Sequence, residues 1–130
     1  MDIIKTWPGF MDQKKVLRVF THAWGRFYFS VGKGKPKQEV EKLWYTHKGL
    51  ILGYFTIAEF FHYEREGQLP PLRSIENKES QWQFRPGIWI AICPPPFVRL
   101  QEELHYAGFQ GWRYFELEKH RESIDALVAI

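Results

Sequence analysis

The chain has 130 residues, of which 45% are hydrophobic and 25% charged, a composition typical of one soluble globular domain. The single cysteine, Cys93, excludes an intramolecular disulfide and a cysteine-based zinc site. The net charge of +3 is uneven, because residues 1–48 hold ten Lys and Arg against four Asp and Glu, and residues 49–130 hold eight against eleven. Such asymmetry is compatible with a polyanionic partner, or with a charge that only aids solubility.

No stretch has the roughly 18 to 20 consecutive apolar residues that span a bilayer. The first ten residues, MDIIKTWPGF, lack the basic start and apolar middle of a signal peptide. Cys93 lies in the apolar run IWIAICPPP, where a buried, inert thiol is expected. We therefore expect a cytoplasmic protein without membrane contact that folds as one domain over residues 1–130.

Strands dominate the first half of the chain. Residues 22–31, HAWGRFYFSV, have the aromatic and β-branched composition of a strand, which ends at the glycines of GKGKPKQ. Residues 40–64 predict a hairpin, with a first strand to about Thr46 and a second strand from Leu50 to about Phe61.

Two glycines predict the turn and an irregularity of this hairpin. Gly49 is expected at positive φ in a turn over residues 47–49. Gly53 interrupts an apolar strand, which indicates a bulge or a close backbone approach.

The second half of the chain predicts a more mixed order of elements. In chain order they are a polar loop over 65–80, a strand over 87–93, a helix over 96–109, a strand over 111–118 and a short terminal helix.

Aromatic residues make up 18% of the chain, which suits a small β-rich fold. We expect an α+β, mainly β architecture, a small pseudo-barrel of about five to six mostly antiparallel strands with one or two peripheral helices.

Two phrases resemble a known family. VEKLWYTHKGLILGYFTIAEF resembles the central hairpin of PUA-like domains, especially the ASCH and EVE groups, and FRPGIWIAI resembles their later strand. The resemblance covers Phe27 to Glu116 and implies a pseudo-barrel that binds RNA or a modified base in a cleft between strands. GKGKPKQEVE departs from the Gly-x-Lys-x-x-Glu pattern of ASCH domains, which puts ASCH-type catalysis in doubt.

The GKGKPKQ segment places Lys33, Lys35 and Lys37 at alternate positions between glycines. Each lysine can neutralise one phosphate, and the glycines allow close approach of the backbone. A solvated turn without a ligand is the alternative interpretation. The segment does not match a P-loop, which requires Gly-x-x-x-x-Gly-Lys followed by Ser or Thr.

WYTHKG places Trp44 and Tyr45 near Lys48. Strand alternation directs Trp44 to one face and Tyr45 to the other. Either ring can stack on a base, or both can pack in the core.

The same alternation applies to GWRYFELE near the end of the chain. Trp112 and Tyr114 are expected on one face, and Arg113 and Phe115 on the other. Trp112 or Tyr114 can line a cleft, while Arg113 can contact a phosphate, stack on a base or pair with a glutamate.

Catalytic and metal-binding patterns are absent from the sequence. The five histidines have no metal-ligand spacing, so we expect no metal and no cofactor. Acid or base chemistry could be assigned to Glu39, Glu41, His47 and Glu59, which are explained more simply as ordinary side chains near the hairpin.

The leading hypothesis is therefore a non-catalytic domain that binds RNA, another nucleic acid or a modified nucleotide. Lys33, Lys35, Lys37 and Lys48 would contact phosphates, and Trp44, Tyr45, Trp112 and Arg113 would flank the base. The alternatives are a small amidohydrolase or RNase on the same fold, and a protein-interaction module with exposed aromatic residues.

Overall fold

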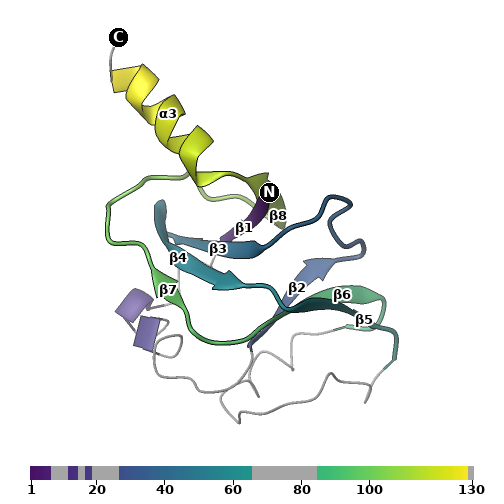
Figure 1. The fold of residues 1–130 in the computed structure, drawn as a ribbon. Helices are drawn as coiled ribbons and strands as arrows, with labels where there is room; N and C mark the ends of the chain where they lie inside the picture. Colours follow the sequence, from purple (N-terminus) through teal and green to yellow (C-terminus); the bar gives the residue numbers. More distant parts are fainter. Residues whose placement is uncertain (7–11, 15–16, 19–26, 66–84, 129–130) are drawn as a thin grey trace.

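The part of the chain that the structure describes contains eight strands in two sheets (Figure 1). The computed structural model describes residues 1–6, 12–14, 17–18, 27–65 and 85–128. The mainly β architecture predicted from the sequence is confirmed, with more strands than expected. Among the described residues, no main-chain pairing closes the two sheets into a barrel.

The larger sheet has the order β7-β4-β3-β1-β8. Its strands are β1 (Asp2–Thr6), β3 (Lys42–His47), β4 (Leu50–Thr56), β7 (Val98–Arg99) and β8 (Trp112–Phe115). β1 runs parallel to β3, and all other neighbours are antiparallel. β1 was not predicted, and its insertion between β3 and β8 joins the two ends of the described chain.

The smaller sheet has the order β2-β6-β5, with β2 (Phe27–Gly32), β6 (Ile88–Cys93) and β5 (Glu59–Tyr63) all antiparallel. The single strand predicted over residues 50–61 is divided between the sheets. Ile57 N donates to Glu41 O and Ala58 N donates to Ile92 O, both at 2.8 Å, where the chain crosses from one sheet to the other.

The main core lies between the two sheets. The larger sheet contributes Ile3, Leu43, Tyr45 and Phe55, and the smaller sheet contributes Phe27, Phe29, Ala91 and Cys93. The rings of Phe29 and Phe55 meet at 5.6 Å across the interface. Burying one such ring stabilises the fold by roughly 1.5–3 kcal/mol, so this layer holds the sheets together.

A second cluster covers the outer face of the larger sheet. Ile4, Trp44, Ile51, Leu104 and Phe115 are buried there, against partly buried residues that include Leu117 and Ile124 of helix α3 (Leu117–Val128). This helix confirms the predicted terminal helix, and it projects from the body beside β8 (Figure 1).

The helix predicted over residues 96–109 is wrong. This segment is extended and follows β4, because Leu100 N donates to Leu52 O at 2.8 Å and Ile51 N donates to Leu104 O at 2.9 Å. Pairing with the edge of β4 and burial of Leu104 on the sheet outweigh the helical spacing of its apolar residues. The loop predicted over residues 65–80 lies outside the described residues after Arg65, as does the 22–26 part of the first predicted strand.

The hairpin glycines behave as predicted. Lys48 and Gly49 form the turn with φ of 50° and 80°. At Gly53 a Cβ atom would lie 2.2 Å from Val98 O and 2.8 Å from Phe97 Cζ, so the backbone of β7 approaches closely there. The register between β3 and β4 also shifts after Tyr45, which marks a bulge.

Side chains join the sheets where β1 and β8 approach β2. Trp112 Nε1 donates to Val31 O at 2.8 Å, and Lys5 Nζ donates to Ser30 O. Trp112 and Lys5 are register partners on neighbouring strands, so they form this seam together.

Candidate nucleic-acid interface

The lysine loop, residues 33–38, connects β2 toward β3 and exposes Lys33, Lys35 and Lys37. Within the described part of the chain, none of the three ammonium groups forms an ion pair. Lys35 Nζ lies 5.0 Å from the ring centroid of Trp89, a cation–π contact. The loop therefore presents positive charge that no described carboxylate neutralises.

A tyrosine on β8 fixes the path of the loop. Tyr114 Oη accepts hydrogen bonds from the main-chain N–H groups of Lys37, at 3.0 Å, and Gln38, at 3.2 Å. The loop is thus attached to the same strand that carries Trp112 and Arg113.

Trp44 and Tyr45 are both only 3% exposed. Trp44 lies on the outer face of the sheet, where its indole Nε1 donates to Asp2 at 2.9 Å, and Tyr45 lies in the inner core. Neither ring presents a face to a ligand, so the arrangement favours the alternative interpretation that both pack in the core.

Strand β8 alternates as the sequence predicts. Trp112 and Tyr114 lie on the inner side, where their rings meet edge to face at 5.1 Å. Arg113 and Phe115 lie on the outer side. Trp112 and Arg113, two of the predicted site residues, therefore lie on opposite faces of one edge strand.

An open groove of about 570 Å³ lies on the outer side. Gly49, His105, Tyr106, Ala107, Arg113 and His120 line it. Gly49 comes from the β3–β4 turn beside exposed Lys48, and its carbonyl accepts a hydrogen bond from Tyr106 N at 2.9 Å. The groove thus brings Lys48 and Arg113, two of the predicted residues, to one region.

Arg113 lies over an aromatic ring. Its guanidinium carbon lies 4.4 Å from the ring centroid of Phe109, and Phe109 is positioned by a 3.3 Å hydrogen bond from its N–H to Thr6 Oγ1. Arg113 is exposed and, within the described chain, in no ion pair. Its free face is therefore available to a base or phosphate.

His120 reaches the groove from the first turns of α3. Its Nε2 lies 2.7 Å from His105 O, and its ring contacts Tyr106 at 5.1 Å and Phe115 at 5.7 Å. Because a carbonyl oxygen only accepts, Nε2 carries the hydrogen, and Nδ1 becomes a donor only when the ring is protonated. The sequence did not single out His105 or His120, because fifteen residues separate them and no motif links them.

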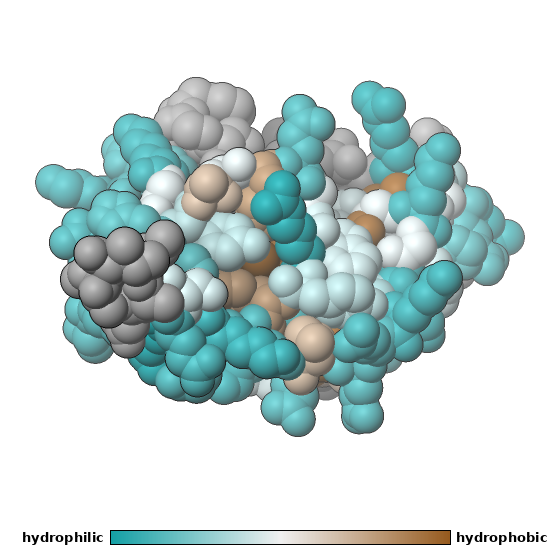
Figure 2. All heavy atoms as spheres, turned by 90° about the horizontal axis from the view of Figure 1, so that it is seen from above, coloured by the Kyte–Doolittle hydropathy of each residue, from teal (hydrophilic) through white to brown (hydrophobic). Residues whose placement is uncertain are grey.

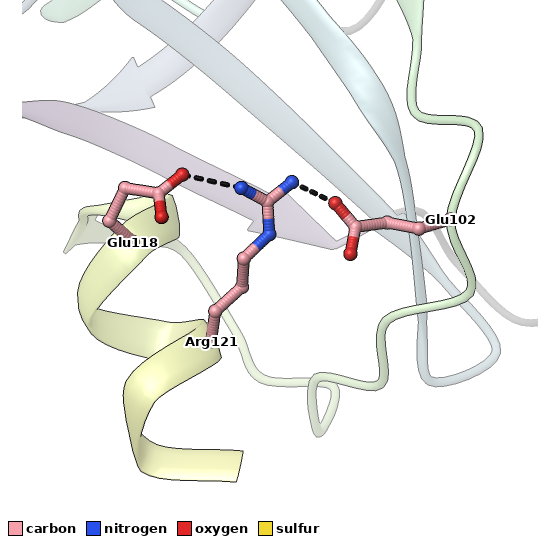
Figure 3. Close-up of polar contacts among 3 residues, drawn as sticks. All are labelled: Glu102, Glu118 and Arg121. Carbon is pink, nitrogen blue, oxygen red and sulfur yellow. Dashed lines mark hydrogen bonds and ion pairs between the residues drawn. The ribbon is translucent and has the colours of Figure 1, made fainter. Parts of the chain in front are cut away.

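Three of the carboxylates around α3 form ion pairs. Arg121 bonds both Glu118 and Glu102, as Figure 3 shows, and this ties the helix to the extended segment after β7. Glu116 forms an ion pair with Lys119 at 3.1 Å. Carboxylates are absent from the described lining of the groove.

The candidate acid and base residues do not converge. Glu41 precedes β3 and His47 ends it, so they are roughly 20 Å apart at about 3.3 Å per residue. Glu39 and Glu59 are exposed, the latter in the other sheet. Among the described residues, no group of three or more His, Cys, Asp or Glu side chains is placed to hold a metal ion.

Burial shifts three pKa values. It lowers the pKa of Lys5 at the seam to about 8. It raises the pKa of Tyr45, with a smaller contribution from Cys93, and it raises the pKa of the fully buried Cys93 thiol. Cys93 therefore has the inert, buried setting expected from the sequence.

Comparison with protein families, curated proteins and solved structures found no match to this chain. The described residues contain no helix with the length and apolar character to cross a membrane.

Proposed function

We propose that this protein binds nucleic acid or a nucleotide along β8. The observation that carries the proposal is the attachment of the lysine loop to Tyr114, next to Arg113 on the same strand. The main chain of the lysine loop is thereby attached to β8 on its inner side, and Arg113 lies on the outer side of the same strand.

The two sides offer different contacts. The lysine loop provides exposed point charges, which suit the phosphates of a nucleic acid of any sequence. Arg113, lying on Phe109, offers a planar cation that can stack on a base or bind a phosphate through paired N–H groups. Trp44 and Tyr45 are omitted from this proposal because their rings are buried.

A divergent PUA-like domain is part of the same proposal. The mainly β fold and the hairpin of β3 and β4 support it, and the open arrangement of two sheets differs from the pseudo-barrel that the resemblance implies.

The surface gives less support to a protein-interaction module. The large hydrophobic residues exposed in the described chain are Met1, Val98 and Tyr114. On the face seen in Figure 2, apolar residues form a narrow patch between hydrophilic side chains. A partner surface of standard size would expose a broader apolar centre.

Fluorescence anisotropy with labelled single-stranded RNA, single-stranded DNA and duplex DNA, each over a range of salt concentrations, tests the proposal. We expect the triple variant Lys33→Ala, Lys35→Ala, Lys37→Ala to reduce the slope of log affinity against log salt by about 2 for single strands. Arg113→Ala should weaken binding at every salt concentration.

Arg99→Ala is the matched control, because it removes an exposed cation from β7, the opposite edge of the same sheet. Four strand spacings place it roughly 19 Å from β8. No binding of any of the three nucleic acids, or equal effects of Arg99→Ala and Arg113→Ala, would rule the proposal out.

A further inference from the structure

We infer that the groove beside Arg113 binds a phosphomonoester, the terminal phosphate of a nucleotide or of an oligonucleotide end. The inference rests on the proposed function for the nucleotide part of the ligand. Its own basis is the set of guanidinium and imidazole side chains that line the groove from β8, α3 and the segment after β7.

The donors match the oxygens of a terminal phosphate. Such a group has three non-ester oxygens, whereas an internal phosphodiester has two. Arg113, which lies over Phe109, supplies a fork of N–H groups, and the imidazole of His105 supplies one more donor, while the Nε2 hydrogen of His120 is already bonded to His105 O.

The charges favour a dianion. One permanent cation and two imidazoles line the groove, and carboxylates are absent from its described lining. On the elements around it, Glu116 is paired with Lys119, and Glu102 and Glu118 are paired with Arg121, as Figure 3 shows for Arg121. Glu103 and Glu122 are exposed but do not line the groove. An anion entering the groove therefore meets the guanidinium of Arg113 and no carboxylate in the described lining.

The shape of the groove admits such a ligand. Gly49 and Ala107 contribute little side-chain volume, and the open groove of about 570 Å³ leaves room for a sugar and base next to the phosphate. Tyr106, which is half-buried, adds an aromatic wall to it.

The test compares two oligonucleotides of one sequence, labelled at the 3′ end, with either a 5′-phosphate or a 5′-hydroxyl. We expect the phosphorylated form to bind on the order of tenfold more tightly. Arg113→Ala should bring the ratio of the two dissociation constants close to one. Arg113→Lys should also lose most of the preference, because lysine keeps the charge without the fork.

The lysine-loop triple variant separates the two proposals. It should weaken both oligonucleotides equally and keep the preference for the phosphate. If neither oligonucleotide binds the natural protein, the proposed function fails. If both bind with the same affinity, nucleic-acid binding stands and the phosphomonoester subsite is wrong.

Competition identifies the source of the phosphate. A nucleoside 5′-monophosphate should displace the phosphorylated oligonucleotide, and the unphosphorylated nucleoside should not. Equal displacement by inorganic phosphate would overturn the assignment to a nucleotide end, because the groove would then recognise the free anion alone.

Discussion

Tyr114 on β8 holds the main chain at Lys37, 77 residues earlier in the sequence, through a 3.0 Å hydrogen bond from the Lys37 N–H to the phenol oxygen. A second bond from Gln38 N to the same oxygen fixes the direction of the loop. The loop is therefore ordered before any ligand arrives, which reduces the conformational entropy lost on binding.

Tyr114→Phe should release the lysine loop. The variant removes the acceptor of two main-chain N–H groups, and we expect a loss of about 1–2 kcal/mol in the free energy of unfolding. Nucleic-acid affinity should fall several-fold while the salt slope stays unchanged, because all the lysines remain. Chemical denaturation and anisotropy titrations measure the two effects.

Tyr54→Phe is the control for this variant, because no hydrogen bond of the Tyr54 hydroxyl occurs in the described structure and its ring lies under Lys42. It should leave binding and stability within about 0.5 kcal/mol of the natural protein. A similar loss in both variants would show that the bonds to Tyr114 do not order the loop.

Gly53→Ala should be strongly destabilising. The added Cβ would lie 2.2 Å from Val98 O and 2.9 Å from Arg99 Cα, and backbone atoms of a paired strand cannot rotate away. We expect a loss of about 3 kcal/mol or more in thermal or urea unfolding.

Gly34→Ala is the matched control, since no atom in the described part of the chain lies within 4 Å of its added Cβ. The free energy of unfolding of this variant should change by less than about 1 kcal/mol. An increase is expected where alanine lowers the conformational entropy of the unfolded chain. A Gly53→Ala protein as stable as Gly34→Ala would mean that β7 does not pack on β4 as described.

Lys5 should make stability rise with pH. Its pKa in the folded protein is about 8, against 10.5 for an ordinary lysine. Between these values the unfolded chain binds a proton that the folded protein does not, so the free energy of unfolding increases, by at most about 1.4 kcal/mol per pH unit.

The measurement is the difference in unfolding free energy between the natural protein and Lys5→Met at pH 7, 8.5 and 9.5. The difference should shift in favour of the natural protein as pH rises. Burial raises the pKa of Cys93 and Tyr45, so these groups lower stability with rising pH, but they are common to both proteins and cancel. A constant difference would contradict the lowered pKa.

His47→Leu should raise stability, although the side chain is fully buried. Neither ring nitrogen has a hydrogen-bond partner among the described residues, and an unsatisfied buried polar group costs about 1–3 kcal/mol. We expect a gain of about 1 kcal/mol in urea unfolding. Leu43→Ala, on the same strand and equally buried, should instead lose about 2–5 kcal/mol. A large loss for His47→Leu would show that the imidazole is bonded in solution.

Local chemistry made parts of the fold predictable. The period of two in a strand placed Trp112 and Arg113 on opposite sides of β8, and steric freedom placed Gly49 in the turn. The close backbone approach at Gly53 was predictable, because glycine weakens the interior of a strand and usually marks a bulge or such an approach.

Long-range pairing was not predictable in this way. β1 has only five residues, and its place between β3 and β8 is decided by partners far along the chain. Leu104 has helical spacing from Gln101, yet its carbonyl accepts a hydrogen bond from Ile51 N of β4 and its segment is extended. The groove shares this origin, because His105, Arg113 and His120 meet only after three elements pack.

The position of β1 also has a consequence for the order of folding. Within the described chain β8 pairs with β1, and the partners Asp2 and Phe115 come from opposite ends of that chain. Closing so long a loop is slow compared with forming the β3–β4 hairpin. The strand that carries Arg113 and Tyr114 can therefore join the sheet only late, after β8 has left the ribosome, and a nascent chain would lack the proposed ligand site until then.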